Sequence, residues 1–440
     1  MPNTILAADR TLSCDTRATG LNNNLLVIGP SGSGKTRHVL KPNLLEMGSS
    51  FIVLDTKGTL AREMGPMLAS HGYRVECLDF ADLSAEASRP LPPEVGRTGY
   101  NPLAFVRYNA AGAPVQQDII SIARAICPVE DESQPFWDHA ASNLLACLIA
   151  YVLEQLPERE RHFGSVVTLA EHLEDKVTVR LLDELEATAP ASFALALWRR
   201  YAPTLTAEKM HASISGILAE KIMCLGFDGA RDLCTSAHRI DFAHLGRERR
   251  ALFVTVNDID RSLDPLTGLF VTQAFTTLIR EADAQPGGRL RVPVRLILDD
   301  FANLNIPDID GILAVIRSRE IWCTLQLQSV NQLEAIYGRP RALSIMGNCD
   351  THLVLAFQDI ESARCYAERA NKLASTLLAT PLDRSWLFIR GRAGEQVRRY
   401  ELTSHPRYAE LAEAVSAKEA TKTLPWERPL LGVDAEPTPA

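Results

Sequence analysis

The chain has 440 residues, of which 46% are hydrophobic and 23% are charged, and its formal net charge is −8. This length exceeds that of one ordinary domain, so we expect two or more structural units. A net negative charge does not indicate a general polyanion-binding surface, so any contact with nucleic acid has to come from local basic patches. None of the nine cysteines forms a C-x-x-C pair, which argues against zinc and disulfides and for reduced thiols in the cytoplasm.

No stretch at the start of the chain has the pattern of a signal peptide. The longest nearly apolar run, about residues 140–153, is too short to cross a bilayer and contains Ser142 and Asn143. We therefore expect this run to form a core helix.

The first nucleotide-binding signal is GPSGSGKT at positions 29–36, which has the spacing of a P-loop. The apolar run Leu25–Ile28 before it predicts a buried strand, and residues 37–47 after it have helical spacing that Pro42 interrupts. Lys35 would reach the β- and γ-phosphates of ATP, and the Thr36 hydroxyl would bind Mg²⁺. The alternative is a glycine-rich turn that binds nothing. The residues expected to contact the nucleotide are Gly29, Pro30, Ser31, Gly32, Ser33, Gly34, Lys35 and Thr36.

The rest of the first part continues an α/β alternation. Residues before 22 are polar and weakly patterned, and we expect an edge strand or a lead-in there. Strands are predicted at 50–55 and 73–79, with a helix at 60–71 between them. This order is typical of a parallel sheet covered by helices. Residues 84–99 are rich in proline, glycine and charge, so they predict a loop.

The pattern changes from about residue 115 to 243, where helical periodicity dominates and proline residues separate the segments. We interpret this part as an all-helical insertion in the α/β domain. Helices are predicted at 136–156, 165–173, 178–185, 191–200 and 207–225.

The α/β alternation then resumes. Strands are predicted at 251–256, 294–298, 321–327 and 351–357, helices at 265–284, 308–319 and 360–373, and a hairpin at 385–390 and 396–401. The tail from Lys422 contains four prolines and predicts a loose end. The predicted fold class is α/β, with these units: a nucleotide-binding domain in two parts (1–110 and 246–408), an all-α insertion (111–245) and a tail (409–440).

Asp299 and Asp300 follow the aliphatic strand at 294–298, which is the Walker B pattern. Asp299 would hold Mg²⁺ with its hydration shell, and Asp300 would orient or deprotonate the attacking water. The alternative is that the two acids belong to a turn or cap a helix. Because aspartate is one carbon shorter than the glutamate common at the second position, we expect slow hydrolysis.

Several segments of the chain resemble those of a known family. Five ordered segments carry the similarity, which extends from about residue 24 to 406: KPNLLEMGSSFIVLDTKGTL, YNPL, FWDHAASNLLACLIAYVLE, LILDDFANLNIPDIDGILAVIRSREIWCTLQLQSVNQLEAIYG and IMGNCDTHLVLAFQDIESARCYAERANK. They resemble the TraG/TraD family of type IV secretion coupling proteins, the ATPases of conjugative DNA transfer.

The resemblance implies a RecA-like motor that uses ATP and Mg²⁺ and assembles into a homo-hexameric ring. It also implies non-sequence-specific DNA binding, a relaxase or another secreted protein as substrate, and type IV secretion channel components at the inner membrane as partners. Gln328 matches the γ-phosphate-sensing glutamine of the family, and Arg317 matches a proposed arginine finger that reaches a neighbour's nucleotide. The alternatives are that Gln328 caps the next helix and that Arg317 and Arg319 form a solvated basic face.

Two departures from the family pattern qualify the resemblance. Members of the family usually carry transmembrane helices before the P-loop, whereas the 28 residues before Gly29 are not apolar. Either this member lacks the anchor, or the anchor is a separate subunit, or the chain is truncated. We expect a cytoplasmic protein that reaches the inner membrane through partners. The Walker B segment of the family usually ends in Asp-Glu, whereas here it ends in Asp299-Asp300. Separately, Asp55 and Lys57 lie in DTKG where the family usually has DPKG, and they would lie near the site or form a structural ion pair.

DNA contacts are implied by the resemblance and not by the composition of the chain. A ring could line its channel with one of several basic clusters, although such clusters are more often solvated faces. Two alternative functions stay open: a substrate receptor in which nucleotide is regulatory, and a DNA translocase of the FtsK/HerA group outside secretion. The clusters contain Arg247, Arg249 and Arg250, then Arg289 and Arg291, and finally Arg390, Arg392, Arg398 and Arg399.

Overall fold

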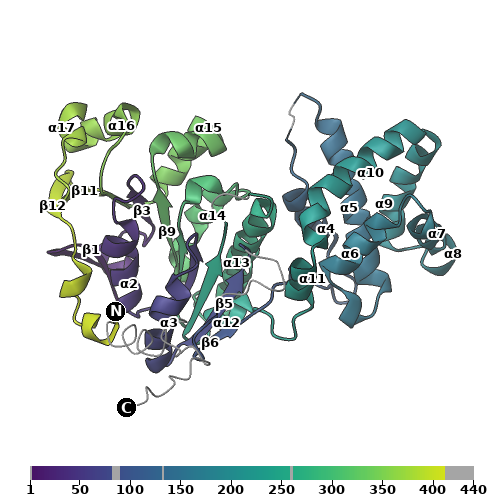
Figure 1. The fold of residues 1–440 in the computed structure, drawn as a ribbon, viewed down its shortest axis with the longest axis horizontal. Coiled ribbons are helices and arrows are strands. Elements are labelled where there is room, and N and C mark those ends of the chain that lie inside the picture. Colours follow the sequence, from purple (N-terminus) through teal and green to yellow (C-terminus); the bar gives the residue numbers. More distant parts are fainter. Residues whose placement is uncertain (1, 82–89, 131–132, 258–260, 412–440) are drawn as a thin grey trace, which may run out of the picture.

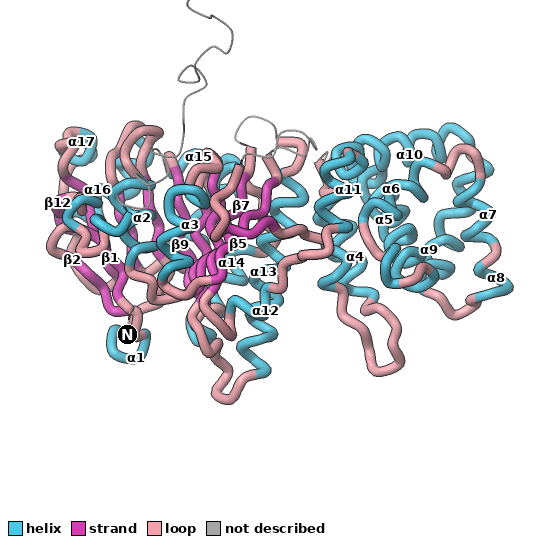
Figure 2. Tube along the Cα trace, turned by 60° about the horizontal axis from the view of Figure 1, so that its bottom comes forward, coloured by secondary structure: helices cyan, strands magenta, loops and turns pink. Residues whose placement is uncertain are grey.

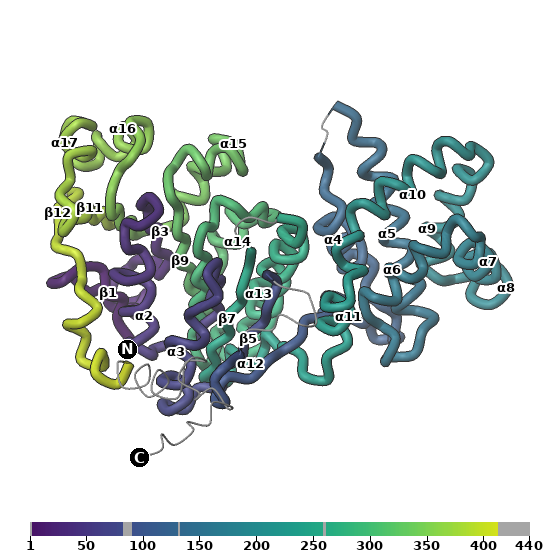
Figure 3. Tube along the Cα trace, in the orientation of Figure 1, coloured from purple at the N-terminus to yellow at the C-terminus, as the bar shows by residue number. Residues whose placement is uncertain are grey.

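Two regions of different architecture make up the structure, a computed structural model that describes residues 2–81, 90–130, 133–257 and 261–411. One region is an α/β unit around a large sheet, and the other consists of helices (Figure 1). Both the start and the end of the described chain lie in the α/β unit, whereas the middle of the chain forms the helical region (Figure 3). The chain therefore leaves the sheet, builds the helical region and returns, as the sequence predicts for an insertion.

Within the described residues, the large sheet has ten strands in the order β12-β11-β10-β3-β9-β8-β4-β7-β5-β6. Neighbouring strands are parallel except for β10 with β11 and β11 with β12. This confirms the mainly parallel sheet, and the predicted C-terminal hairpin forms its antiparallel edge. The strands are β3 (Leu25–Ile28), β4 (Ser50–Asp55), β5 (Arg74–Asp79), β6 (Val95–Arg97), β7 (Arg250–Thr255), β8 (Val294–Leu298), β9 (Ile321–Leu327), β10 (Thr351–Val354), β11 (Arg384–Ile389) and β12 (Glu395–Arg398).

The central strands are apolar along most of their length because both faces of the sheet are covered. All residues of β3, β4, β7, β8 and β9 are buried. Successive side chains point to opposite faces, so Ile52 and Leu54 join one core while Phe51 and Val53 join another. The helices of the α/β unit are α2 (Lys41–Leu45), α3 (Leu60–Ser70), α12 (Phe242–Leu245), α13 (Asp264–Ala284), α14 (Ile309–Val315), α15 (Val330–Gly347), α16 (Ile360–Ala370) and α17 (Ala374–Leu378).

The first residues form an element of their own, although the sequence predicts only an edge strand or a lead-in. The strands β1 (Asn3–Ala7) and β2 (Arg10–Ser13) pair as a separate antiparallel sheet, and the short helix α1 (Thr16–Thr19) follows. Asn43 of α2 holds this hairpin, because its side chain accepts from Ile5 N (2.9 Å) and donates to Ile5 O (3.0 Å). The hairpin is thereby fixed to the helix that follows the P-loop.

The inserted region contains helices and loops only, within its described residues (Figure 2). Its central helix is α5, which packs against α4, α6, α9 and α10. The order of these helices confirms the all-helical insertion predicted from periodicity. They are α4 (Gln116–Ile126), α5 (Pro135–Gln155), α6 (Phe163–Glu171), α7 (Val177–Asp183), α8 (Leu185–Thr188), α9 (Phe193–Tyr201), α10 (Glu208–Ile222) and α11 (Asp228–Thr235).

By length and composition, α5 is apolar enough to cross a membrane, and with 21 residues it is longer than the predicted apolar run. However, 72% of its most apolar window is buried inside the structure. Its side chains face neighbouring helices, as expected for a core helix.

Three local predictions differ from the structure. The segment predicted as a loop at 84–99 contains β6, a short strand that pairs with β5; residues 82–89 lie outside the described part. The helix after the P-loop begins with a π-helical turn (Thr36–Leu40), in which Lys41 N donates to Thr36 O. This turn lies directly before Pro42, which has no backbone N–H to donate to the usual α-helical acceptor. The helix predicted at 308–319 divides into α14 and a 3₁₀ turn at Arg317–Arg319. The tail from Lys422 lies outside the described residues.

Replacing Leu148 in the centre of α5 tests the core of the insertion. Leu148 is fully buried, so Leu148→Ala is expected to lower the free energy of unfolding by roughly 2–5 kcal/mol through reduced burial and a cavity. Urea unfolding followed by circular dichroism measures this change. Asn143→Ala, at an exposed position of the same helix, should have little effect, and equal changes in both variants would contradict the central role of α5.

Candidate active site

The P-loop segment leaves β3 at the carboxyl edge of the sheet, between the ends of β10 and β9. Gly32 and Gly34 have φ angles of +75° and +88°, a region that glycine adopts without steric cost. A side chain at Gly34 would also collide with His38, since a Cβ there would lie 2.4 Å from His38 Cδ2. The glycines therefore allow a tight turn directly before the helix, as a phosphate-binding loop requires.

The loop fits an anion through its free donors. Ser33 Oγ is buried and has no hydrogen-bond partner among the described residues. The helix that starts at Thr36 offers N–H groups without intrahelical acceptors, together with the positive end of its dipole. A phosphate group would supply acceptors to these donors. The residues predicted to contact nucleotide all lie in this one turn and at the start of the helix after it: Gly29, Pro30, Ser31, Gly32, Ser33, Gly34, Lys35 and Thr36.

The Lys35 ammonium lies over its own loop. Its Nζ donates to Gly29 O at 2.7 Å and to Pro30 O at 3.4 Å. Burial lowers the pKa of Lys35, whereas the nearby Asp300 and Asp299 carboxylates raise it. The ammonium is therefore a mostly desolvated charge close to both Walker B acids.

Asp299 and Asp300 follow β8 at the same edge of the sheet as the P-loop. Burial, and after it the neighbouring Asp300 carboxylate, raise the pKa of Asp299 to about 6, against the opposing effect of Lys35. The Asp299 carboxylate accepts from Asp300 N at 3.1 Å. Asp300 has φ 45° and ψ 42°, a left-handed conformation that aspartate adopts more readily than most residues.

Gln328 follows β9, the strand between β3 and β8. Its Nε2 donates to Asp300 Oδ1 at 3.3 Å, so the amide and the second Walker B acid are in contact. Gln328 does not cap the next helix, because Ser329 occupies the N-cap of α15 and its side chain accepts from Gln332 N. The structure therefore brings Lys35, both acids and Gln328 together at the ends of three neighbouring strands.

Arg317 lies at the other edge of the sheet, since it comes before β9 whereas Gln328 comes after it. It is exposed, and its Nη2 donates to Gly20 O at 2.8 Å. The structure therefore does not bring Arg317 to the P-loop of its own chain. Arg319, by contrast, is paired with an acidic residue: it donates two hydrogen bonds, of 2.7 and 3.1 Å, to the Asp283 carboxylate.

Asp55 ends β4, next to β8. Its carboxylate accepts from Lys57 N at 3.1 Å and from Leu60 N at 2.7 Å. Burial raises the pKa of Asp55, and backbone N–H donors, of which Leu60 has the largest effect, lower it. Asp55 thus fixes the DTKG turn through backbone N–H groups, and its charge also raises the pKa of Asp299.

Comparison with known proteins decides the family. The chain matches the model of the family described as "Type IV secretory system Conjugative DNA transfer" over residues 6–372. The chain belongs to this family. It is also 22% identical over 353 residues to Protein VirD4 of Rhizobium rhizogenes, an alignment that covers 77% of this chain and 47% of VirD4. The chain thus spans about half the length of this curated relative.

Solved structures with the same architecture support the fold of this family member. The coupling protein TrwB in complex with the ATP analogue ADPNP has a TM-score of 0.62 at 16% identity, over 87% of this chain and 86% of TrwB. TrwB with ADP and Mg²⁺ has a TM-score of 0.62 at 17% identity, over 86% of each chain. VirB4 of Thermoanaerobacter pseudethanolicus has a TM-score of 0.55 at 14% identity, over 93% and 98%. Both the predicted family and the RecA-like P-loop NTPase fold are confirmed.

Arg399 contacts the P-loop, although it was predicted to belong to a basic cluster available to nucleic acid. Arg399 is buried, and its guanidinium donates to Ser33 O (2.9 Å) of the P-loop, to Leu355 O (2.5 Å) and to Arg384 O (3.0 Å). Burial lowers the pKa of Arg399. The sequence pattern that could have indicated this burial is the alternation of buried and exposed residues along β12. Continued by one residue, it places Arg399 on the buried side with Val397 and leaves Arg398 exposed.

The first two basic clusters are largely neutralised or stacked. Arg250 is buried and contacts Glu248 and Glu76, so it cannot face a channel. The remaining contacts are those of Arg247 with Glu281 (2.7 Å), Arg289 with Glu320 (3.3 Å), and Arg249 over the ring of Tyr73 (6.0 Å).

Arg399→Met tests the contact between the last strand and the P-loop. Hydrogen bonds from a charged group contribute about 1.5–3 kcal/mol each, so we expect nucleotide affinity to fall about tenfold or more. Titration with a fluorescent ATP analogue measures Kd. Arg398→Met, at the exposed neighbouring position, is the matched control and should keep the original Kd. An unchanged Kd in Arg399→Met would show that Ser33 is held without this guanidinium.

Proposed function

We propose that this chain is an ATP-driven motor that couples a relaxase–DNA complex, or another secreted protein, to a type IV secretion channel. The observation that carries this proposal is the meeting of Lys35, the Asp299–Asp300 pair and Gln328 at one edge of the sheet. Phosphoryl transfer requires these groups, since catalysis depends on positioning and on charge stabilisation. TrwB, which has the same fold, has been solved with an ATP analogue and with ADP and Mg²⁺.

The residues at this edge fit a magnesium–nucleotide complex. Thr36 and Asp299 would hold Mg²⁺, because hydroxyl and carboxylate oxygens are ligands that this ion prefers. The raised pKa of Asp299, caused by burial and by Asp300, is typical of a carboxylate pair that a cation would stabilise. Bound Mg²⁺ would neutralise negative charge on the β- and γ-phosphates.

Three side chains would then act on the terminal phosphate. Lys35 would leave the carbonyl oxygens of its own loop and bind the β- and γ-phosphates. Asp300 would orient the attacking water and accept its proton. Gln328, which now donates to Asp300, would donate to the γ-phosphate instead, so that departure of this phosphate changes its contacts.

The position of Arg317 supports a ring. A side chain at the edge opposite its own P-loop can serve the nucleotide of a neighbour in a head-to-tail assembly, and such an assembly closes into a ring when the rotation permits. We propose a homo-hexamer in which Arg317 stabilises the transition state in trans. The ring would lie in the cytoplasm, associated with the inner membrane through channel components, and would hold DNA without sequence specificity. In this proposal the motor domain comprises residues 1–110 and 246–408. The helical region, residues 111–245, contacts substrate proteins, and residues 409–440 are the tail.

A second candidate is a substrate receptor whose nucleotide sets conformation with little turnover. The helical region favours it, because large apolar side chains are exposed there, namely Phe136, Met223 and Phe227, and exposed apolar side chains often mark protein-binding surfaces. The shorter acid at position 300 is also compatible with slow hydrolysis.

ATP hydrolysis with and without DNA separates the two candidates. We expect single- or double-stranded DNA to raise the steady-state rate, and this stimulation to fade with salt, because phosphate contacts release counterions. Lys35→Ala should lower the rate by roughly 10²-fold or more. Tight ATP binding without turnover under every DNA condition would favour the receptor.

Mixing two inactive variants tests the assignment of Arg317. Arg317→Ala is expected to reduce kcat by about 10³-fold, as for other arginine fingers. Adding Lys35→Ala subunits should restore part of the activity, since some interfaces then combine an intact P-loop with an intact Arg317. Arg319→Ala is the control, and it should retain activity because Arg319 is paired with Asp283. Absence of recovery on mixing would contradict action in trans.

A further inference from the structure

A pocket of about 500 Å³ lies at the amino edge of the parallel strands, opposite the P-loop. Asp350 comes directly before β10, and Arg390 and Arg392 come directly after β11. Because β11 runs antiparallel to β10, these positions meet at the same edge. The end of α15 and the middle of α16 complete the wall. The pocket is therefore separate from the nucleotide site and can be occupied at the same time.

Three guanidinium groups give the pocket a positive charge. Arg369 and Arg392 form no ion pair with any residue in the described part of the chain, whereas Arg390 is paired with Asp350 at 3.2 Å. Arg369 lies over the rings of Tyr366 (5.5 Å) and Phe388 (5.2 Å). Two of the three guanidinium groups thus form no ion pair among the described residues, and the one carboxylate in the pocket lining, Asp350, is paired with Arg390.

His352 holds Arg369 in place without adding charge. Its Nε2 lies 3.0 Å from Met346 O and 2.9 Å from Cys349 O, and carbonyl oxygens only accept, so Nε2 carries the proton. Burial lowers the pKa of His352 to about 4, which leaves Nδ1 as an acceptor at neutral pH. The Tyr366 hydroxyl lies 2.7 Å from Nδ1 and Arg369 Nη1 lies 3.2 Å from the same nitrogen. This contact and the stacking on Tyr366 and Phe388 position the guanidinium, which keeps other N–H donors for a ligand.

The rest of the lining is apolar. Leu343, Met346 and Phe388 contribute to the wall, and Leu343 is 47% exposed. An apolar surface beside guanidinium groups suits a base and its phosphate, because bases stack on apolar and guanidinium planes while arginine binds the backbone. The volume is within the range of small-ligand pockets, which is enough for a nucleotide of one strand and too small for a duplex.

We propose that this pocket binds single-stranded nucleic acid, with the Arg369 and Arg392 guanidinium groups on backbone phosphates and the apolar wall against a base. The inference rests on the proposed role in DNA transfer and names the strand-binding site. Arg390 would link the pocket to Arg317, since both guanidinium groups donate to the same oxygen, Gly20 O, at 2.7 and 2.8 Å. A strand in the pocket would therefore adjoin the residue assigned to the neighbour's nucleotide.

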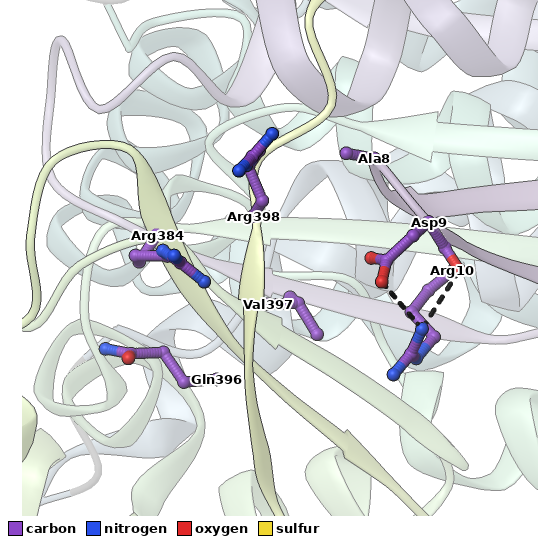
Figure 4. Close-up of a pocket in the computed structure, with 7 residues that line it drawn as sticks. All are labelled: Ala8, Asp9, Arg10, Arg384, Gln396, Val397 and Arg398. Atoms are coloured by element: carbon purple, nitrogen blue, oxygen red, sulfur yellow. Dashed lines mark hydrogen bonds and ion pairs between the residues drawn. The ribbon is translucent and has the colours of Figure 1, made fainter.

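Another arginine-lined pocket in the same chain provides a matched control. It has about 310 Å³ and lies beside the β1–β2 turn (Figure 4). There Arg10 is paired with Glu395 and Asp9. Arg384 and Arg398 are cross-strand neighbours on β11 and β12, and Arg384 also forms an ion pair of 3.6 Å with Asp383. Replacing Arg384 and Arg398 removes two positive charges, as many as replacing Arg369 and Arg392, without changing the proposed pocket.

Cys365 reports directly on occupancy, because it lines the pocket and is the one exposed cysteine among the nine. Burial of part of the thiol raises its pKa, so alkylation is best followed at mildly alkaline pH, where the thiolate reacts. A single-stranded oligonucleotide at ten times its Kd should slow alkylation of Cys365 about tenfold, by mass action. ATP alone should give no protection.

Salt dependence of oligonucleotide binding gives the second measurement. The Arg369→Gln, Arg392→Gln double variant should lower the slope of log K against log salt by about 1.4, or about 0.7 for each phosphate that the protein no longer neutralises. In this variant the oligonucleotide should also fail to protect Cys365. The Arg384→Gln, Arg398→Gln control should keep both the original slope and the protection.

The possible failures of this proposal and of the proposed function are distinguishable. An oligonucleotide that binds the unmodified protein but leaves Cys365 fully reactive overturns the pocket and leaves the motor intact. Protection by a phosphopeptide and not by DNA overturns it in favour of a protein ligand. Absence of any DNA binding, with or without ATP, overturns the pocket together with the proposed DNA motor.

Discussion

The parallel packing of β3, β9 and β8 is the constraint on which the rest of the structure depends. These strands are buried on both faces, and the register places Ile28 beside Leu327 and Leu298 beside Leu325. Their interiors therefore offer mainly apolar side chains, and the polar groups of the site appear where the strands end. Since parallel neighbours end at one edge, segments far apart in the sequence bring their polar side chains into contact there. The hydrogen bond from Gln328 to Asp300 is the direct result.

Charge balance at this edge explains which ligand it suits. Buried charges are costly without partners, and the pKa shifts run in the directions that reduce this cost: burial raises the pKa of Asp299 and Asp55 and lowers that of Lys35. A phosphate chain would stabilise the lysine, and a divalent cation would stabilise the carboxylates. A ligand that carries both satisfies the whole set, which is why these residues together favour a metal-bound nucleotide over a simple anion.

The sequence predicted those parts of the fold and of the candidate site that local patterns encode. Runs of apolar residues bounded by turns indicated the strands before the P-loop and before Asp299, and family motifs indicated Gln328 and Arg317. Contacts between distant segments have no local signal. Arg399 reaches Ser33 across a sequence separation of 366 residues, and no motif marks that pair. The left-handed backbone of Asp300 and the three-residue strand β6 likewise depend on neighbouring segments. The domain boundaries and the catalytic roles stay predictions.

The β11–β12 hairpin shows why closeness in sequence misled the grouping of arginines. Four of them, within ten residues, were predicted as one basic cluster: Arg390, Arg392, Arg398 and Arg399. In a parallel sheet each connection returns to the starting edge, but an antiparallel hairpin carries the chain from one edge to the other. Its turn holds Arg390 and Arg392 at the amino edge, and the end of β12 returns Arg399 to the P-loop. The antiparallel strands of the large sheet therefore connect its two edges. One short hairpin thus supplies arginines both to the loop expected to hold phosphate and to the pocket on the opposite side.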